Sequence, residues 1–445
     1  MKYKLIAIIL FSCLTIVGAM GQAKQYTLDE CMRYATEQSF MTGRAWRNVS
    51  ISRQDYTAAI GNHLPSINAS VGASSNFGRG IDPATNTYIN TTTFSNSYGA
   101  NLSLPIFRAF SLLNNTLASK VARARAVSEY QKAMDDVALS VMGLFIDVLY
   151  NKRLVDLTAR RVENFTKDLY RAQRMSELGT SSASDVAQFA ATLAAEELSL
   201  VTRSNVYDQS LLSLKEKMNF PLEDTLLIAT DIIAPVVEVQ FKSAASIFEA
   251  AADYLPAIDI LNKTLRIQKY NLKIARSGYY PSISAWAGAS TNFFTNLTLP
   301  SSASASFGTQ FRDNIGEGVS VSMSIPIFNG LNTRTSVAKA RLAYDQAASD
   351  YNEQMRALRV EIERAVMDLE TCQSQVAGAE KSVRASRLAL RAAQGKYAEG
   401  VIDVIALNTT ANQMMMAEVE LLSARLQYEI KNRQVNYYTG VALVK

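Results

Sequence analysis

The residue types that most often carry chemistry are sparse in this sequence, and their spacing forms no recognisable site. The chain holds one histidine, His63, and three cysteines, Cys13, Cys31 and Cys372. A metal centre needs several His, Cys or carboxylate ligands at defined spacings, and the sequence has no such cluster. His63 stands directly before Leu64-Pro65, where a helical pattern ends, so a position at a helix boundary accounts for it.

Motifs for nucleophilic or phosphate chemistry are missing from the sequence as well. It contains no GxSxG, no glycine-rich loop followed by lysine, and no nucleophile at a recognisable distance from a base. Carboxylates such as Asp135-Asp136 and Glu361 with Glu363 have Lys and Arg neighbours on helical faces, and solvated helix surface explains them. We therefore expect no catalytic residue, no metal site and no cofactor, and an enzyme is the function that the sequence supports least.

The dominant pattern is an apolar residue at every seventh position of a helical run from about Ala109 to Leu178. A helix of roughly 70 residues would be about 105 Å long, far beyond the helices of compact globular domains. A strict seven-residue repeat favours left-handed supercoiling with partner helices. The alternative is one helix of a soluble bundle. The seam consists of Val127, Met134, Val141, Val148, Val155, Val162 and Leu169.

The same seam occurs a second time, displaced by 221 residues. Its members are Ala348, Met355, Ile362, Leu369, Val376, Val383 and Leu390. The chain is therefore an internal duplication, and each seam must be buried against the other copy or against other chains. We assign residues 24–220 to the first repeat, 221–242 to a non-helical connector and 243–445 to the second repeat.

Residues 1–23 form the pattern of a secretory signal peptide, so the mature chain leaves the cytoplasm. Lys2 and Lys4 precede an apolar run, and small residues follow it. A bacterial lipoprotein box at Leu10-Phe11-Ser12-Cys13 is an alternative, although Phe11 fits it poorly. A retained membrane helix is a further alternative, but the run is shorter than the roughly 20 apolar residues that a span requires.

The two cysteines beyond this segment, Cys31 and Cys372, both fall in predicted helices. Cys372 lies on the side of the second seam, so a buried and unreactive thiol is the first interpretation. A disulfide between the two stays open at this point, because their separation is unknown.

The composition also argues against a nucleic-acid partner. Lys and Arg total 45 against 40 Asp and Glu, and these charges are dispersed along helices rather than gathered into a patch. No second stretch of the sequence is long and apolar enough for a membrane helix, so a membrane passage would have to use strands.

Four segments alternate apolar with small polar residues, as strands with two unlike faces do. The apolar positions are Ile67, Ala69, Val71 and Ala73; Tyr98, Ala100, Leu102 and Leu104; Ile283, Ala285 and Ala287; and Val319, Val321, Met323 and Ile325. They fit transmembrane strands of about 9–11 residues, with apolar side chains toward lipid and serines toward a wet lumen. A soluble sandwich would alternate similarly, but it is not normally attached to helices this long. Four strands cannot close a barrel, whereas three chains would supply twelve.

Shorter helices flank these strands. Thr27 and Glu30 form a capping pattern at the start of a helix that should run to about Gly61, and a second helix is expected from about Ser243 to Ser277.

Each long helix should end in a short break and return. Gly179 and Gly400 suit the left-handed turn that stops a helix, and Ser184 or Asp185 can cap the first returning helix. The returning helices should end near Phe220 and Tyr438.

Several duplicated motifs resemble the TolC family of outer membrane efflux proteins. They are Leu64-Pro65-Ser66-Ile67 with Tyr280-Pro281-Ser282-Ile283, Leu102-Ser103-Leu104-Pro105-Ile106-Phe107 with Met323-Ser324-Ile325-Pro326-Ile327-Phe328, the opening Tyr26-Thr27-Leu28-Asp29-Glu30-Cys31, and Gly179 with Asp185-Val186. The fold expected is mainly α with a β-barrel portion. The resemblance implies a homotrimer with a shared twelve-stranded barrel in the outer membrane of a Gram-negative bacterium and a periplasmic α-barrel of coiled-coil helices.

The resemblance also implies a function. The duct would be the exit of a tripartite efflux or secretion system, receiving small molecules or protein from a periplasmic adaptor and an inner-membrane transporter. A trimeric structural or adhesin-like coiled coil would explain the long helices but not the strands. A stand-alone porin would explain the strands but not the helices.

In relatives the periplasmic end is held shut at the helical hairpins, and adaptors dock on their turns. Alignment on the two glycines assigns a tip constriction to Asp185 and Tyr397. The docking turns would be Leu178, Gly179 and Thr180, and Glu399, Gly400 and Val401. Carboxylates usual in the family fall on Ala406 and Thr409, and its basic residue on Ile402. We hypothesise that Asp403 supplies a displaced acidic ring; alternatively it caps the helix starting at Val404.

Overall fold

The structure, a computed structural model, describes residues 24–81, 86–179, 182–230, 243–298 and 306–443. The predicted signal peptide lies outside these ranges. The chain divides into two compact units, and each takes segments from both copies: unit 1 comprises residues 1–47, 128–259 and 354–445, and unit 2 comprises residues 48–127 and 260–353. None of the described helices is both long enough and apolar enough to cross a membrane.

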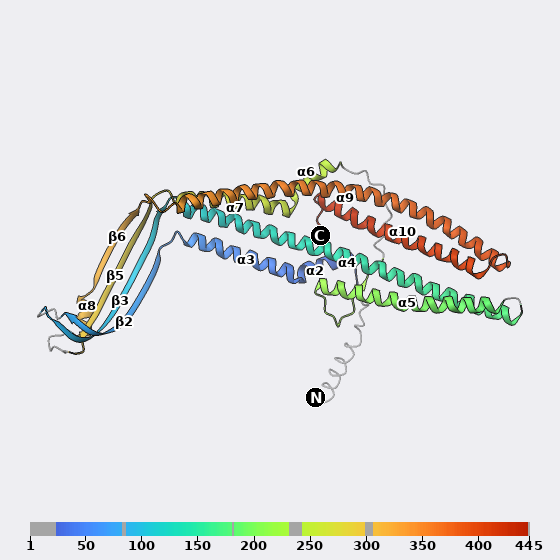
Figure 1. Cartoon of the computed structure of the whole chain (residues 1–445), viewed down its shortest axis with the longest axis horizontal. Helices are drawn as coiled ribbons and strands as arrows, with labels where there is room; N and C mark the ends of the chain where they lie inside the picture. The colour runs from blue at the N-terminus through green and yellow to red at the C-terminus, as the bar shows by residue number, and fades with distance from the viewer. Residues whose placement is uncertain (1–23, 82–85, 180–181, 231–242, 299–305, 444–445) are drawn as a thin grey trace, which may run out of the picture. The chain divides into compact units, whose positions relative to one another are not determined.

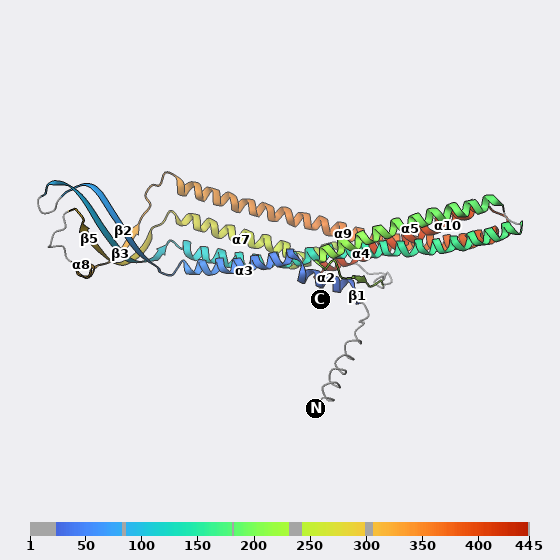
Figure 2. The ribbon, with the colours of Figure 1, turned by 90° about the horizontal axis from the view of Figure 1, so that it is seen from below.

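Two helices of equal length confirm the predicted duplication. α4 (Ser111–Glu177) and α9 (Asn332–Ala398) each contain 67 residues, and both of their ends are displaced by the same interval as the predicted seam. The middle of each seam is buried, as at Val148 and Ile362, which are both 0% exposed. In unit 1, α5 (Ala183–Met218) lies along α4, and α10 (Val404–Tyr438) lies along α9 (Figure 1 and Figure 2).

The helices before the strands are each broken once, which corrects the uninterrupted helices expected from the sequence. α2 (Leu28–Gln38) and α3 (Phe40–Gly61) meet at Ser39, and α6 (Ala244–Tyr254) and α7 (Pro256–Ser277) meet at Leu255. Both junction residues have extended backbone, with ψ of 135° and 127°. Pro256 explains the second break, because proline disfavours helical backbone at the residue before it and fits the first position of a helix.

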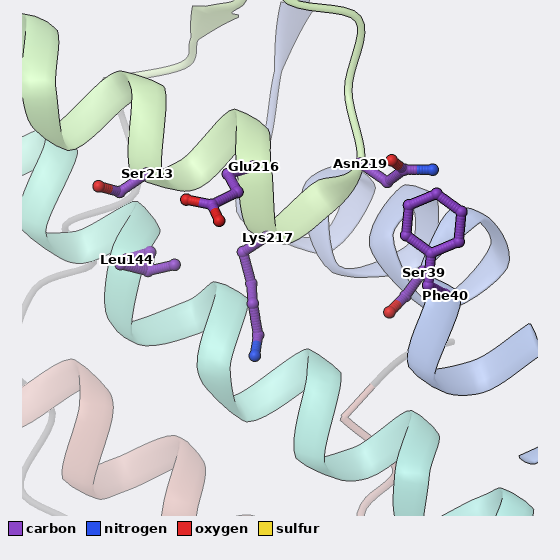
Figure 3. Close-up of a pocket in the computed structure, with 7 residues that line it drawn as sticks. All are labelled: Ser39, Phe40, Leu144, Ser213, Glu216, Lys217 and Asn219. Carbon is purple, nitrogen blue, oxygen red and sulfur yellow. The ribbon is translucent and has the colours of Figure 1, made fainter. Parts of the chain in front are cut away.

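The first break has no proline, and side-chain hydrogen bonds stabilise it instead. The side-chain oxygen of Ser39 accepts the N–H of Met41 at 3.2 Å. The side-chain amide of Asn219 donates to the carbonyl of Gln38 at 3.1 Å, which satisfies one of the carbonyls at the end of α2. Figure 3 shows the pocket beside this break, which is lined by Ser39, Phe40, Leu144, Ser213, Glu216, Lys217 and Asn219.

The main hydrophobic core of unit 1 forms where α2 packs against α4 and α5. One face of α2 enters it with Leu28, Cys31, Met32 and Ala35, at the spacing of successive helical turns. Thr27 and Glu30 form the predicted capping box at the start of α2. The largest fully buried side chains that meet α2 are Phe145, Leu149, Leu214 and Met218.

Both cysteines are buried free thiols. The interpretation of Cys372 as a buried thiol is therefore confirmed, and the alternative of a disulfide with Cys31 is wrong. Burial raises the pKa of the Cys31 thiol to about 12, and burial also raises the pKa of Cys372, so both stay protonated and unreactive at neutral pH.

The predicted connector carries a short strand in its described part. β4 (Leu227–Ile228) pairs in parallel with β1 (Gln25–Tyr26). The N–H of Ala229 adds a bond to the carbonyl of Tyr26 at 2.9 Å. This pairing places residues 25–26 beside the residues that follow the first repeat. Residues 231–242 lie outside the described ranges.

Unit 2 contains one antiparallel sheet in the order β2-β3-β5-β6 (Figure 1). Its strands are β2 (Ser66–Ile81), β3 (Tyr88–Arg108), β5 (Ser282–Asn296) and β6 (Gly316–Ser324). All four predicted strands are present, and the pairing of β3 with β5 joins the two copies. β2, β3 and β5 have 16, 21 and 15 residues and β6 has nine, so three strands exceed the roughly 9–11 residues expected of a tilted span.

The strand register gives the sheet the two unlike faces that the alternation predicts. One row across all four strands consists of Ile67, Leu102, Ala287 and Val319. The adjacent row on the opposite face consists of Asn68, Asn101, Gly288 and Gly318. On the apolar face Val319 is 82% exposed within the single chain. The sheet therefore presents an uncovered apolar surface on one side and a polar surface on the other.

Trp286 is a large aromatic residue on the polar face. It lies opposite Ser103 and Ser320. A Cβ atom added at Gly288 would lie 2.5 Å from its ring, and one at Gly318 would lie 3.2 Å from it. The indole therefore occupies the space that side chains at these two positions would need.

Candidate functional site: the two hairpin tips

The two helical hairpins of unit 1 turn at the predicted glycines. Gly179 has φ of +74° and Gly400 has φ of +73°, a backbone conformation that glycine adopts without a steric cost. At the second turn the N–H of Val401 donates to the carbonyl of Lys396 at 2.8 Å, and the N–H of Gly400 donates to the carbonyl of Tyr397 at 3.0 Å. This pair of bonds is the Schellman arrangement that ends a helix.

The returning helices begin with side-chain caps. The hydroxyl of Ser182 accepts the N–H of Asp185 at 3.1 Å, which corrects the expectation that Ser184 or Asp185 is the cap. Several residues of this Ser-rich turn could cap a helix, and Ser182 has the extended backbone that an N-cap residue adopts. Asp185 then stands in the first turn of α5, where a negative charge is favourable.

Asp403 caps α10, as the second of the two sequence interpretations proposed. Its carboxylate accepts the N–H of Ala406 at 2.8 Å, and α10 begins at Val404. The side chain is exposed. An acidic ring would require three chains, so that role stays a proposal.

The apolar side chains of both hairpins meet in one cluster, which we call the tip cluster. Phe189 of α5 is 1% exposed and Val404 of α10 is 2% exposed. The rings of Phe189 and Tyr397 pack edge to face with centroids 6.0 Å apart. The cluster consists of Phe165, Leu169, Ala172, Val186, Phe189, Leu193, Tyr397 and Val404. It buries apolar surface contributed by α4, α5, α9 and α10, and therefore favours the hairpins lying together.

Tyr397 and Asp185, the predicted constriction pair, lie close enough to interact electrostatically. Burial raises the pKa of the Tyr397 hydroxyl, and the negative charge of Asp185 raises it further. The hydroxyl therefore keeps its proton at neutral and mildly alkaline pH, and it is available as a donor to a carboxylate.

A polar cluster deeper in the hairpins was not found from the sequence. Arg161 of α4 donates to Glu196 of α5 at 2.5 Å and to the side-chain oxygen of Asn412 of α10 at 2.7 Å. A second guanidinium nitrogen lies 2.7 Å from the sulfur of Met415. The guanidinium also stacks over the ring of Phe165 at 5.6 Å. We call these residues the Arg161 bridge, because they connect the first hairpin to the second.

Burial makes this bridge sensitive to the loss of a partner. The side chains of Arg161 and Glu196 are 14% and 16% exposed. Burial lowers the pKa of the Arg161 guanidinium, and the charge of Glu196 opposes this effect. A charge held in such a place is stabilised only while its partners remain.

The predicted docking turns are exposed. Leu178 is 79% exposed and Val401 is 65% exposed, and Gly179, Glu399 and Gly400 are also on the surface. Thr180 lies outside the described ranges. Each hairpin therefore has one exposed apolar side chain at its apex.

Comparison with known proteins identifies one matching family. The family described as outer membrane efflux protein matches residues 36–219 and 248–441. These two stretches correspond to the two copies, and the interval between them contains the whole connector.

Individual relatives are similar over most of their length. The chain is 22% identical to the outer membrane protein TolC of Vibrio cholerae over 349 residues, which cover 77% of this chain and 76% of that protein. It is 21% identical to a probable efflux pump outer membrane protein, TtgC, of Pseudomonas putida over 434 residues, which cover 94% and 84%. The crystal structure of the CmeC outer membrane channel of Campylobacter jejuni shares the fold, with a TM-score of 0.80, 17% identity, and 93% and 85% of the two chains covered.

Proposed function

This chain belongs to the outer membrane efflux protein family, and on that premise we propose that three copies of it close into one duct. The protein resides in the outer membrane, extends into the periplasm and serves as an exit duct. In our proposal the sheets of three chains form a shared twelve-stranded barrel, and the long helices form a periplasmic tube. The duct then receives its cargo from a periplasmic adaptor and an inner-membrane transporter.

The main observation in support of a trimer is that the sheet of one chain has two unpaired edges. Within the described residues, β2 pairs only with β3 and β6 pairs only with β5. In hydrocarbon an unpaired strand edge is not tolerated, because its N–H and C=O groups have no water to bind. Pairing β6 of one chain with β2 of the next satisfies both edges. Eight strands from two chains would barely enclose their side chains, whereas twelve leave a passage.

The hairpin tips are the proposed gate of the duct. The tip cluster and the Arg161 bridge hold the two hairpins of a chain together, and the contact of Asp185 with Tyr397 acts as a latch at the constriction. An adaptor that docks on the turns at residues 178–180 and 399–401 opens the tip by binding the open form better than the closed form.

Substitution of Tyr397 tests the gate. Tyr397→Phe keeps the ring that packs on Phe189 and removes the hydroxyl that can bind Asp185. We expect cells carrying this variant to admit more of a large antibiotic that the closed duct excludes. Tyr170→Phe is the matched control, because Tyr170 is a 60% exposed tyrosine of α4. Unchanged uptake in Tyr397→Phe would count against the latch.

A further inference from the structure

A short helix, α8 (Phe307–Asp313), completes the edge of β5 where β6 has ended. β6 pairs with β5 from Ser282 to Ser290 only. Beyond that point β5 continues to Asn296, still paired with β3 on its other side. The outward-pointing backbone groups of this part of β5 therefore need partners other than a strand.

Side chains of α8 and of its C-cap residue supply those partners. The side-chain amide of Gln310 accepts the N–H of Phe294 at 3.1 Å and donates to the carbonyl of the same residue at 3.0 Å. The side-chain amide of Asn314 donates to the carbonyl of Asn292 at 2.7 Å. The two amides make the bonds that a neighbouring strand would make at alternate residues. α8 thus takes the place of the missing part of β6.

Aromatic packing holds α8 against the apolar face of the sheet. The ring centroids of Tyr98 and Phe311 are 5.3 Å apart, and those of Phe293 and Phe307 are 5.3 Å apart. Thr291, 8% exposed under the helix, donates its hydroxyl to the carbonyl of Phe311 at 2.7 Å. Despite these contacts, Phe307 stays 45% exposed and Phe311 stays 37% exposed.

The far part of β2 offers a surface that matches the exposed side of α8. β2 has 16 residues and β6 has nine, so a β6 strand that pairs with residues 66–74 of β2 in another chain leaves the outer edge of residues 75–81 unpaired, while their other edge stays paired with β3. Phe77 in this segment is 79% exposed and lies on the same face of the sheet as Tyr98. Arg79 follows on that face and lies over the ring of Tyr88. The side chain of Asp313 in α8 is 61% exposed and lies 3.6 Å from Nε of the neighbouring Arg312.

We propose that α8 of one chain packs against residues 75–81 of β2 in a second copy of this chain. Phe307 and Phe311 meet Phe77, and Asp313 meets Arg79. α8 thereby forms the wall between subunits in the region that the short β6 cannot reach. The inference rests on the proposed trimer and adds a contact to it that is not made by strand pairing. Packing of these aromatic groups against lipid is the competing possibility for the same surface.

A photo-cross-linking experiment in intact cells distinguishes these partners. Phe311 is replaced by p-benzoylphenylalanine in the full chain, irradiated, and analysed by denaturing electrophoresis and mass spectrometry. We expect a cross-linked dimer in which residue 311 is joined to a peptide containing residues 75–81. Attachment to lipid alone, attachment only within the same chain, or no product would overturn the proposal.

The same probe at Val319 of β6, which is 82% exposed, separates this proposal from the trimer. If Val319 yields cross-links to β2 and Phe311 does not, the contact of α8 is wrong while the shared barrel stands. If neither position yields a product joining two chains, the trimer fails as well.

A charge exchange gives a second, independent test. Asp313→Arg and Arg79→Asp should each lower the temperature at which the oligomer dissociates in detergent, because each places like charges opposite one another. The double variant should recover most of that loss. An additive effect of the two substitutions would contradict the proposed pair.

Discussion

Replacing Arg161 by methionine should shift the tip toward its open form. The change keeps much of the apolar stem but removes the bonds to Glu196 of α5 and Asn412 of α10, which are 2.5 and 2.7 Å long. A hydrogen bond to a charged group contributes about 1.5–3 kcal/mol. Of these two oxygen acceptors, Glu196 belongs to the same hairpin as Arg161, and Asn412 belongs to the second hairpin. We therefore assign about 2 kcal/mol, the value for the bond to Asn412, to the free energy of separating the two hairpins. That value corresponds to a roughly thirtyfold change in the ratio of open to closed tips per chain.

The assay is single-channel recording of the purified duct in a planar bilayer. We expect Arg161→Met to raise the fraction of time spent in the high-conductance state. Arg160→Met is the matched control, since Arg160 is the exposed neighbour on the same helix. Glu196→Gln should have a smaller effect than Arg161→Met, because it leaves the bond to Asn412 in place. Equal open fractions for the variants at 160 and 161 would refute the assignment of Arg161 as a bridge between hairpins.

Three further predictions concern other parts of the chain. Asp403→Asn keeps the helix cap, because asparagine caps as well as aspartate, and it should reduce the block of the reconstituted pore by cations. Unchanged cation block and conductance would refute the hypothesis of an acidic ring. Gly288→Ala should destabilise the protein by about 1–3 kcal/mol through overpacking against Trp286, seen as an earlier thermal transition, while Gly316→Ala, whose added Cβ would have no neighbour nearer than 4.0 Å, should not. Burial raises the pKa of Asp135 above its ordinary value of 3.8. The folded state is therefore stabilised by protonated Asp135 at pH values below 3.8, and this stabilisation is lost as the pH rises through the pKa of the folded state. In Asp135→Asn, the melting temperature should depend less on pH between about pH 4 and neutrality.

Long-range periodicity made the large elements predictable from the sequence. The seven-residue seam and its second copy can be read from the spacing of residues along one helix. The observed α4 begins and ends close to the predicted bounds, and α9 has the same length. The alternation in the four strands likewise gave the faces of the sheet, because a strand places successive side chains on opposite sides. Gly179 and Gly400 marked the turns, since a left-handed residue ends a helix.

Features that depend on distant residues could not be predicted in the same way. The break at Ser39 is stabilised in part by Asn219, which is far away in the sequence, and no proline or glycine marks it. Arg161 looked like any other surface charge of a helix, because its partners lie on α5 and α10. α8 has seven residues, too few to show helical periodicity. The roles of Asp185, Tyr397 and Asp403 at the tip stay predictions, because the gate they would form involves more than one chain.

The most direct test of the exit-duct account is cross-linking from the apex of the first hairpin in living cells. A photo-reactive residue at Leu178, which is 79% exposed, is activated, and the captured proteins are identified by mass spectrometry. The account predicts a periplasmic adaptor on this residue, together with an oligomer of three chains of about 140 kDa. Capture of the trimer alone, in cells that contain the adaptor, would contradict docking at the tip and the role as the exit of a tripartite system.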